Sequence, residues 1–470
     1  MIRAIFQDSG IYGLGLILPR IGLFLLLPLY TALIPLSDFG LISIFNLVTA
    51  YLSLLMTGAA ETCIPTFYKP DYTPERRLIL GAVVVYSLAA AGAVGGLLVW
   101  QGRGLLDLVI NPASYAHAAH LLKYVVLASC AGVPAIFLEI ILRLENCPRL
   151  LVAINFLSFV LTNGAIVVLL AVYRLGLAGY VYGQCAAAAL MGGVALFLLK
   201  GYVSYNVSLD KALKVYHLSW RVFIHNLIST TGQSFDRIFL ARYAPMASLG
   251  IYTVAEKLTL AFQLPANALS YGILPYFFKE AEGRAVQLRR AVTMVVFMAC
   301  LLALFLICFS DLIVGAMTPP SYHEAGNILP LLVLVMFIKF VWTFYSRKMV
   351  YLEQTGKLPL ISSLATLAGG LVGYYLIRHY GLLGACWGMI IYRLIFLVLG
   401  WLLTRDLPFP GLQDSVLVGS VILMGLITLL FRQLEMGVLR LTVGGLASLG
   451  LCLYIWSYLG ASSRLKEKAL

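Results

Sequence analysis

The sequence predicts an all-α integral membrane protein with about fourteen transmembrane helices, built from two parallel-repeat six-helix lobes and two C-terminal helices. Three observations predict it. Of the 470 residues, 61% are apolar and only 11% charged, with a mean hydropathy of +0.94. Apolar runs long enough to cross a bilayer follow one another along the whole chain, and one half resembles the other. Lipid is therefore expected to be the main solvent of this protein.

Each predicted span is an apolar run close to the roughly 20 residues that a helix needs to cross a bilayer. The connections between spans are short, which argues against a folded catalytic domain outside the membrane. The predicted spans are 11–33, 40–67, 78–100, 121–142, 150–173, 177–199, 219–241, 250–278, 290–314, 327–346, 358–377, 382–404, 413–431 and 439–459.

The net charge of +13 has a topological explanation. Lys and Arg are spread over short connections, such as Arg76 and Arg77 or Arg289 and Arg290, and do not cluster beside aromatic residues. No nucleic-acid partner is therefore expected. These connections alternate with poorly charged ones, and positive charge collects on the cytoplasmic side of a membrane. Both termini are predicted to be cytoplasmic.

No metal or other cofactor is predicted. The eight cysteines lie mostly inside apolar runs and form no CxxC pair, so they are interpreted as small buried hydrophobic residues. His117 and His120 are one helical turn apart, but no acid or cysteine nearby supplies a third ligand.

An internal repeat organises the chain. Residues 35–69 align without gaps onto 245–279, so that residue n matches residue n + 210. Six spans separate equivalent helices, which makes the halves parallel repeats that enter the membrane in the same direction. The identical pairs are Pro35/Pro245, Gly40/Gly250, Thr49/Thr259, Leu54/Leu264, Pro65/Pro275, Phe67/Phe277 and Lys69/Lys279.

The repeat predicts the domain organisation. Residues 1–200 are expected to form the first lobe, 201–218 a cytoplasmic linker and 219–405 the second lobe. Residues 406–470 would add two further helices and a cytoplasmic tail. Paired lobes of this kind bind their substrate at the mutual interface and alternate access by rocking, so the sequence predicts that mechanism here.

Polar side chains recur on one face of three predicted spans. Such residues are costly in hydrocarbon, so they should line a cavity or hydrogen-bond one another between helices. Cavity lining and hydrogen bonding between helices both stay open. The repeat favours a shared cavity, because it superimposes the polar face of the second span on that of the eighth. The stripes are Ser43, Asn46, Ser53, Thr57 and Glu61; Asn226, Thr230, Gln233 and Arg237; and Glu256, Gln263, Asn267 and Ser270.

Cations within the spans predict an anionic substrate. Arg20 follows Pro19 in the first span and has no acid three or four residues away to neutralise it. Arg and Lys in a partly dry cavity suit phosphate or carboxylate groups. The candidate substrate-binding residues are Arg20, Arg237, Lys257, Asn46, Ser53, Thr57, Gln233, Gln263 and Asn267. The candidate coupling-ion or charge-pair residues are Glu61, Glu139, Asp236 and Glu256.

Three passages resemble the polysaccharide transporter branch of the multidrug/oligosaccharidyl-lipid/polysaccharide (MOP) flippase superfamily. One is Pro19-Arg20 followed by the segment 33–41, LIPLSDFGL. Another is the segment 236–243, DRIFLARY, which leads to the segment 255–258, AEKL. The third is the connection 144–146, LEN. Together with the repeat and the helix count, the resemblance covers nearly the whole chain.

The resemblance implies a two-lobed, V-shaped, MATE-like bundle and a flippase, not an enzyme. It implies transport of an undecaprenyl-diphosphate-linked oligosaccharide, an O-antigen (lipopolysaccharide) or exopolysaccharide repeat unit, from the cytoplasmic to the periplasmic leaflet of a bacterial inner membrane. The cationic cavity would receive the pyrophosphate or an acidic sugar. Its implied partners are the lipid-linked oligosaccharide, the bilayer and the polysaccharide polymerase machinery.

Three alternative functions fit these residues less well. A lipid II flippase of the same superfamily has several cavity arginines, whereas the second span here offers Glu61. A cation-coupled multidrug or small-solute exporter tends to have an acid in the first span, where this chain has Arg20. A polysaccharide polymerase or ligase needs a larger outside loop than the connections near 101–120 and 315–326 provide.

Overall fold

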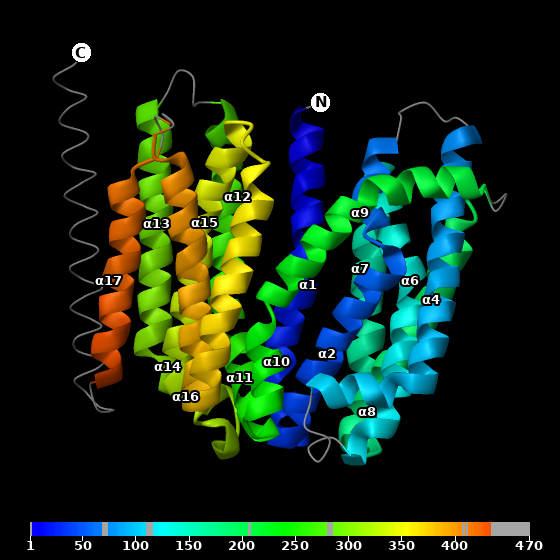
Figure 1. Ribbon diagram of the computed structural model, residues 1–470, viewed down its shortest axis with the longest axis horizontal. Helices are drawn as coiled ribbons and strands as arrows, with labels where there is room; N and C mark the ends of the chain where they lie inside the picture. Colours follow the sequence, from blue (N-terminus) through cyan, green and yellow to red (C-terminus); the bar gives the residue numbers. More distant parts are fainter. Residues whose placement is uncertain are drawn as a thin grey trace. The chain divides into compact units, whose positions relative to one another are not determined.

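The computed structural model is almost entirely helical, and no strand occurs among the residues it describes (Figure 1). Those residues are 2–67, 74–109, 116–204, 208–279, 285–406, 409 and 412–433. Within these ranges nine helices are long and apolar enough to cross a bilayer. The predicted all-α, multi-pass membrane fold is confirmed. The last predicted span, 439–459, lies outside the described residues.

The chain divides into two compact units, Met1–Gly250 and Ile251–Leu470. The helix α11 (Met246–Leu258) begins in unit 1 and continues into unit 2. The other elements of unit 1 are α1 (Ile2–Leu33), α2 (Leu36–Thr57), α3 (Ala60–Cys63), η1 (Ile64–Phe67), α4 (Pro74–Val109), η2 (Ala116–Leu121), α6 (Leu122–Leu144), α7 (Pro148–Val167), η3 (Val168–Val172), α8 (Gly176–Leu199), α9 (Leu209–Gly232) and α10 (Phe235–Tyr243).

Helix α6 forms the centre of unit 1, where it packs against α2, α4 and α8. Helix α9 crosses this group obliquely in Figure 1 and contacts α2, α3 and α4. The predicted linker 201–218 is helical from Leu209, and residues 219–250 pack within unit 1, whereas the sequence grouped them with the second lobe. The predicted lobe boundaries stay a prediction.

Unit 2 is built around α15, which contacts α12, α13, α14, α16 and α17. Aromatic rings fill its centre, where Phe262 of α12 packs against Phe337 and Phe340 of α15. The remaining elements of unit 2 are α12 (Leu260–Lys279), α13 (Ala285–Cys308), α14 (Ser310–Met317), η4 (Pro320–Tyr322), α15 (Ala325–Tyr351), α16 (Lys357–Thr404) and α17 (Asp414–Gln433).

Helix α16 contains two of the predicted spans, 358–377 and 382–404. Gly381 separates them with φ 54° and ψ −124°, a backbone conformation outside the helical region. An L side chain rarely adopts this φ, so glycine suits the position. The two predicted helices are therefore distinct, although they follow each other without a loop.

Four other predicted spans are interrupted, among them 290–314, which breaks at Phe309 between α13 and α14. The span 40–67 breaks at Gly58 and Ala59, which have φ 57° and 56°. The span 219–241 breaks between α9 and α10, and the span 250–278 breaks at Thr259. Hydropathy does not detect such breaks, because the residues on both sides remain apolar on average.

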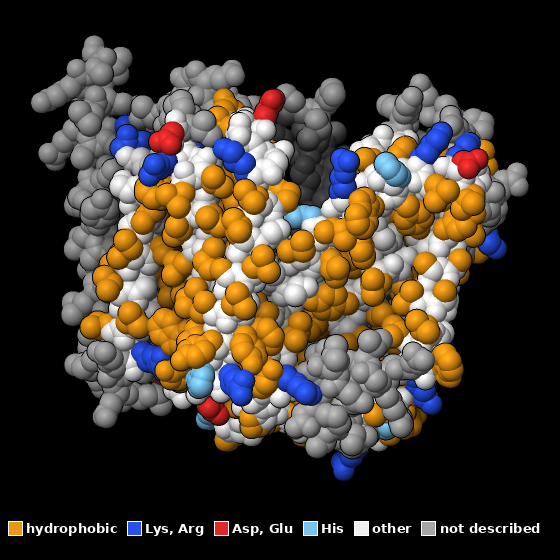
Figure 2. Space-filling view, viewed as in Figure 1, with side chains coloured by type: hydrophobic (Ala, Val, Ile, Leu, Met, Phe, Trp, Pro, Cys, Tyr) orange, Lys and Arg blue, Asp and Glu red, His pale blue; other side chains and the backbone are white. Residues whose placement is uncertain are grey.

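Apolar side chains cover the flanks of the helices in each unit, and charged side chains gather near helix ends (Figure 2). Large apolar residues are widely exposed, including Trp100 at 79%, Phe197 at 71% and Leu371 at 72%. Water would oppose an apolar surface of this extent, whereas the hydrocarbon core of a bilayer is a suitable solvent for it.

Candidate functional site

Unit 1 contains a polar cavity of about 350 Å³. The end of α2, the short helix α3 and the end of α9 form most of its wall, and Ile136 of α6 contributes an apolar patch. Its polar lining combines hydroxyls, amides and one carboxylate. The polar lining residues are Ser53, Thr57, Glu61, Asn226, Ser229, Thr230 and Gln233.

The break between α2 and α3 forms one wall of the cavity. Gly58 ends α2 in a left-handed conformation, and its backbone N–H donates to the carbonyl of Leu54 at 3.0 Å. Ala59 follows with φ 56°, which costs a non-glycine residue free energy and persists only when the surroundings enforce it. Ser53, Thr57 and Glu61 all line the cavity despite this break.

The opposite wall is the last turns of α9. Asn226, Thr230 and Gln233 lie four and three residues apart, and all three line the cavity. The Gln233 amide donates to the Ser229 hydroxyl at 3.1 Å, which fixes its position. Beside the cavity, the hydroxyls of Tyr51 and Thr231 are 3.0 Å apart and link α9 to α2.

Arg237 does not continue this stripe. Helix α9 ends at Gly232, and Arg237 lies on the separate helix α10. The four-residue spacing from Gln233 presumes an unbroken helix, and the break changes the direction of the chain. The predicted common face therefore includes Asn226, Thr230 and Gln233 but not Arg237.

The cavity is acidic. Among the residues that the structure describes, Glu61 is the only ionisable one that lines the cavity, and no described Lys or Arg does. The Oε2 atom of Glu61 is buried and has no hydrogen-bond partner in the described part of the chain. The cations predicted to contact substrate lie elsewhere, with Arg20 exposed on α1, Arg237 on α10 and Lys257 in unit 2. Their proposed role stays a prediction.

Asn46 contacts another helix instead of this cavity. Its side chain lies beside the hydroxyl of Tyr180 on α8. Nearby, the buried Tyr30 hydroxyl donates to Oδ1 of Asn163 at 2.7 Å, and the Asn163 amide donates to the Phe159 carbonyl at 2.8 Å. These contacts match the alternative reading in which polar residues join helices within a bundle.

Two candidate site residues of unit 2, Gln263 and Glu256, belong to a chain of hydrogen bonds at the break between α11 and α12. The Gln263 amide donates to the Thr259 hydroxyl at 2.9 Å, and that hydroxyl donates to the Glu256 carbonyl at 2.6 Å. Asn267 is exposed one turn further along α12. Gln263 therefore stabilises the local backbone.

The two remaining acid candidates are in unit 1. Glu139 forms an ion pair with Arg143 one turn further along α6, and both side chains are substantially exposed. Asp236 is buried, and its Oδ1 accepts the backbone N–H of Arg237 at 2.8 Å. Glu139 therefore has a charge partner in the structure, as the predicted charge-pair role requires. The coupling-ion role stays a prediction.

Two buried cations were missed by the sequence analysis. Arg347 donates to the Ser270 carbonyl and Lys348 donates to the Thr404 carbonyl, each at 2.8 Å. Both lie near the end of a predicted span, where a basic residue normally reaches toward water. Only the packing of α15 against α12 and α16 shows that they are buried.

Known proteins resemble this chain in sequence over part of its length. A family model described as "Polysaccharide biosynthesis protein" matches residues 149–281. Protein 1 of the Lsg locus of Haemophilus influenzae is 22% identical over 304 residues, which is 59% of this chain and 67% of that protein. A second membrane protein of Haemophilus influenzae is 23% identical over 61% of this chain and 68% of its own length.

Solved structures share the fold at low identity. The lipid II flippase MurJ, in an inward closed conformation, has a TM-score of 0.76 at 15% identity and covers 95% of this chain and 99% of its own. An inward-facing multidrug MATE transporter has a TM-score of 0.64 at 13% identity, covering 83% of this chain and 97% of its own. This chain shares the fold of these two structures, and the predicted resemblance to the polysaccharide branch of the MOP superfamily is confirmed.

Proposed function

We propose that this protein is a flippase that moves an undecaprenyl-diphosphate-linked oligosaccharide from the cytoplasmic to the periplasmic leaflet of a bacterial inner membrane. The oligosaccharide would be an O-antigen or exopolysaccharide repeat unit, passed on to polysaccharide polymerase machinery. The observation that carries the proposal is the polar cavity of unit 1, which opens among membrane-spanning helices and is lined by hydroxyls, amides and Glu61. The match to a polysaccharide biosynthesis family supports the substrate class.

The chemistry of the cavity suits a sugar. Sugar hydroxyls both donate and accept hydrogen bonds, and Ser, Thr, Asn and Gln side chains do the same. A volume of about 350 Å³ falls at the lower end of the range for small-molecule sites. The Glu61 Oε2 atom has no donor among the described residues, so this carboxylate can accept hydroxyl or ammonium protons of a sugar.

The same cavity does not favour an acidic group, because Glu61 would repel it. The pyrophosphate would therefore bind elsewhere. Arg20, Arg237 and Lys257 remain the proposed contacts for that group, since Arg binds phosphate through two parallel hydrogen bonds and Lys as a point charge. In this proposal the sugar and the pyrophosphate are recognised by different residues.

The decisive experiment is to deplete the protein in its native cell and assign undecaprenyl-linked glycans to a membrane leaflet. Accumulation on the cytoplasmic leaflet is expected, and complementation with wild type should reverse it. Complementation with Arg20→Ala should leave part of the glycan on the cytoplasmic side, although the variant inserts into the membrane normally. Normal surface polysaccharide in the depleted cell, with no second flippase present, would refute the proposal.

One observation favours a second function. A half-buried acid in a cavity whose other described lining residues are neutral also suits a cation, so Glu61 is compatible with a cation-coupled exporter of small solutes. That function predicts drug sensitivity of the depleted cell without a polysaccharide defect. Accumulation of lipid II instead of the oligosaccharide carrier would assign the chain to lipid II transport.

A further inference from the structure

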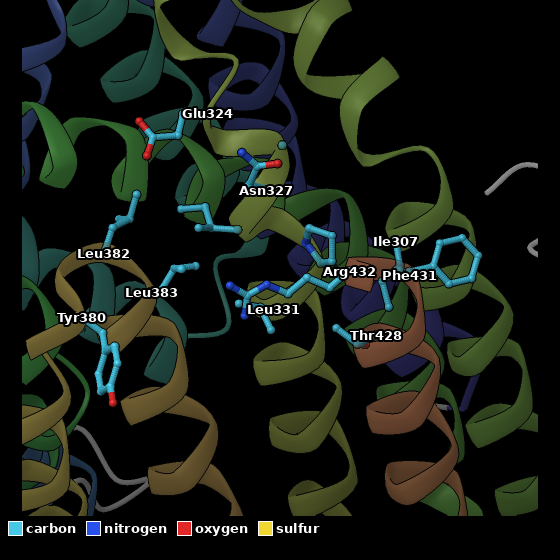
Figure 3. A pocket seen from close by; sticks show the side chains of 13 residues that line it. Ile307, Glu324, Asn327, Leu331, Tyr380, Leu382, Leu383, Thr428, Phe431 and Arg432 are labelled. Atoms are coloured by element: carbon cyan, nitrogen blue, oxygen red, sulfur yellow. The ribbon is translucent and has the colours of Figure 1, made fainter. Parts of the chain in front are cut away.

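A second cavity, of about 480 Å³, lies in unit 2 (Figure 3). It is formed at one end of the helices, by the start of α15, the reversal of α16 at Gly381 and the last turn of α17. Residues on four separate segments therefore meet there, because Ile307 of α13 also lines the cavity. None of them was a candidate site residue in the sequence.

The cavity has an acidic side and a basic side. Glu324 precedes α15 and Asn327 is in its first turn, while Arg432 reaches in from α17, as Figure 3 shows. The remaining wall is largely apolar and includes Leu331, Leu382 and Phe431.

These polar side chains have no partner among the residues that the structure describes. No ion pair joins Glu324 to Arg432, and in the described part of the chain neither side chain has a hydrogen bond or a charged partner. The Asn327 amide is equally unused there. Opposite charges that line one cavity without pairing leave room for a ligand between them, because each side chain keeps its full capacity to donate or accept.

We propose that this cavity binds a phosphoethanolamine zwitterion, with the phosphate at Arg432 and the ammonium group at Glu324. An Arg guanidinium forms two parallel hydrogen bonds to phosphate oxygens, and a carboxylate accepts ammonium protons. Asn327 supplies a further amide donor. The inference is independent of the proposed transport function.

Ligands of a single charge fit less well. A free phosphate at Arg432 would share the cavity with the carboxylate of Glu324 and be repelled by it. A simple cation at Glu324 would meet the guanidinium in the same way. Only a molecule that carries both charges satisfies both sides.

The position of the cavity favours a lipid as the source. Helix α17 is apolar enough to cross a bilayer and ends at the cavity, so Arg432 lies at the depth of lipid headgroups. On the preceding turns of α17, the side chains of Ile422, Leu426 and Leu430 are 59%, 60% and 50% exposed, so they can contact the acyl chains of a lipid. A phosphatidylethanolamine molecule would present its headgroup and its chains to these two surfaces.

The test is native mass spectrometry of the purified full chain, incubated with phosphatidylethanolamine or with phosphatidylglycerol of the same acyl chains. The wild-type protein should retain more phosphatidylethanolamine than phosphatidylglycerol. Arg432→Gln and Glu324→Gln should each weaken its binding about tenfold, the loss expected for one charge-assisted hydrogen bond. The exposed residues Arg405 and Glu353 provide matched controls, and Arg405→Gln and Glu353→Gln should bind as wild type does.

The two variants should differ in how strongly they bind the anionic lipid, phosphatidylglycerol. Glu324→Gln removes the repulsion of the anionic headgroup and should raise phosphatidylglycerol binding, whereas Arg432→Gln should weaken both lipids. A variant that is merely misfolded would lose both lipids and unfold at a lower temperature. Equal retention of the two lipids by wild type, or variants with unchanged lipid preference, would overturn the proposal.

A further arm identifies the source of the zwitterion. Water-soluble glycerophosphoethanolamine is added in competition with the lipid. Failure to compete would assign the site to the membrane lipid, because the acyl chains would then supply much of the affinity. Full competition would assign it to a soluble zwitterion of the same chemistry.

Discussion

Gly40 and Gly250 lie against each other where α2 and α11 begin, and they are equivalent positions of the internal repeat. A side chain at Gly40 would collide with the Met246 carbonyl, and one at Gly250 would collide with the Leu36 carbonyl. The repeat that matches residue n with n + 210 also matches Leu36 with Met246. The contact is therefore reciprocal, as in a two-fold interface in which residue i meets j and j meets i.

Replacing one of these glycines should destabilise unit 1. Gly250→Ala places a methyl group against a backbone carbonyl that cannot move aside like a flexible side chain. Overpacking of this kind costs about 1–3 kcal/mol. The change should lower the thermal unfolding temperature of the purified protein in detergent.

Gly164→Ala is the matched control, because nothing lies within 4 Å of the position of its added methyl group. It lies within α7, where alanine is favoured over glycine by about 0.5–1 kcal/mol. Its unfolding temperature should be unchanged or higher. Equal stability of Gly250→Ala and wild type would contradict the close contact.

Glu61→Gln should impair transport without unfolding the protein. The substitution keeps the size of the side chain and removes its charge in a cavity whose other described lining residues are not ionisable. If the carboxylate accepts substrate or cation protons, the rate should fall by about tenfold, the value of one charge-assisted hydrogen bond. Leaflet assignment of the lipid-linked glycan measures the effect.

Glu353→Gln serves as the control for Glu61→Gln, since Glu353 is exposed in a connection of unit 2. Its transport should equal that of wild type. Wild-type transport by Glu61→Gln would remove Glu61 from the proposed site, and recovery in Glu61→Asp would indicate that the charge matters more than its position.

Thr230→Val should weaken substrate binding modestly. Valine has nearly the shape of threonine but lacks the hydroxyl that Thr230 presents at the cavity. One neutral hydrogen bond contributes about 0.5–1.5 kcal/mol. The substrate concentration that gives half-maximal transport in a vesicle assay should therefore rise roughly 2- to 10-fold.

Thr293→Val provides the comparison for this change. Thr293 lies on α13, and its hydroxyl donates only to the Arg289 carbonyl of its own helix at 2.9 Å. Its substrate dependence should match that of wild type. A Thr230→Val protein that shows the same dependence would place the substrate outside this cavity.

Tyr30→Phe should destabilise unit 1 without altering its surface. The substitution removes the donor of the 2.7 Å hydrogen bond to Asn163, which is buried with Tyr30. Hydrogen bonds between membrane helices contribute roughly 0.6 kcal/mol on average and up to about 1.7. Thermal unfolding in detergent should show a small decrease, and Tyr173→Phe, at the exposed position just after η3, should show none. A Tyr30→Phe protein as stable as wild type would mean that the bond contributes nothing net.

The length and order of the apolar runs determined the fold class, because backbone groups in hydrocarbon must be hydrogen-bonded within helices. The sequence also predicted part of the polar face of the second span. Ser53, Thr57 and Glu61 recur at four-residue spacing, and the structure brings them to one cavity with residues of α9.

Only the tertiary structure decided which polar residues share that cavity. Helical periodicity presumes an unbroken helix, and the break after Gly232 separates Arg237 from Gln233. Asn46 has the spacing of a cavity residue, but its partner Tyr180 is distant in sequence and becomes a neighbour only when α8 packs in unit 1. The pairing of segments that are remote along the chain depends on packing between helices, which the periodicity of a single helix does not contain.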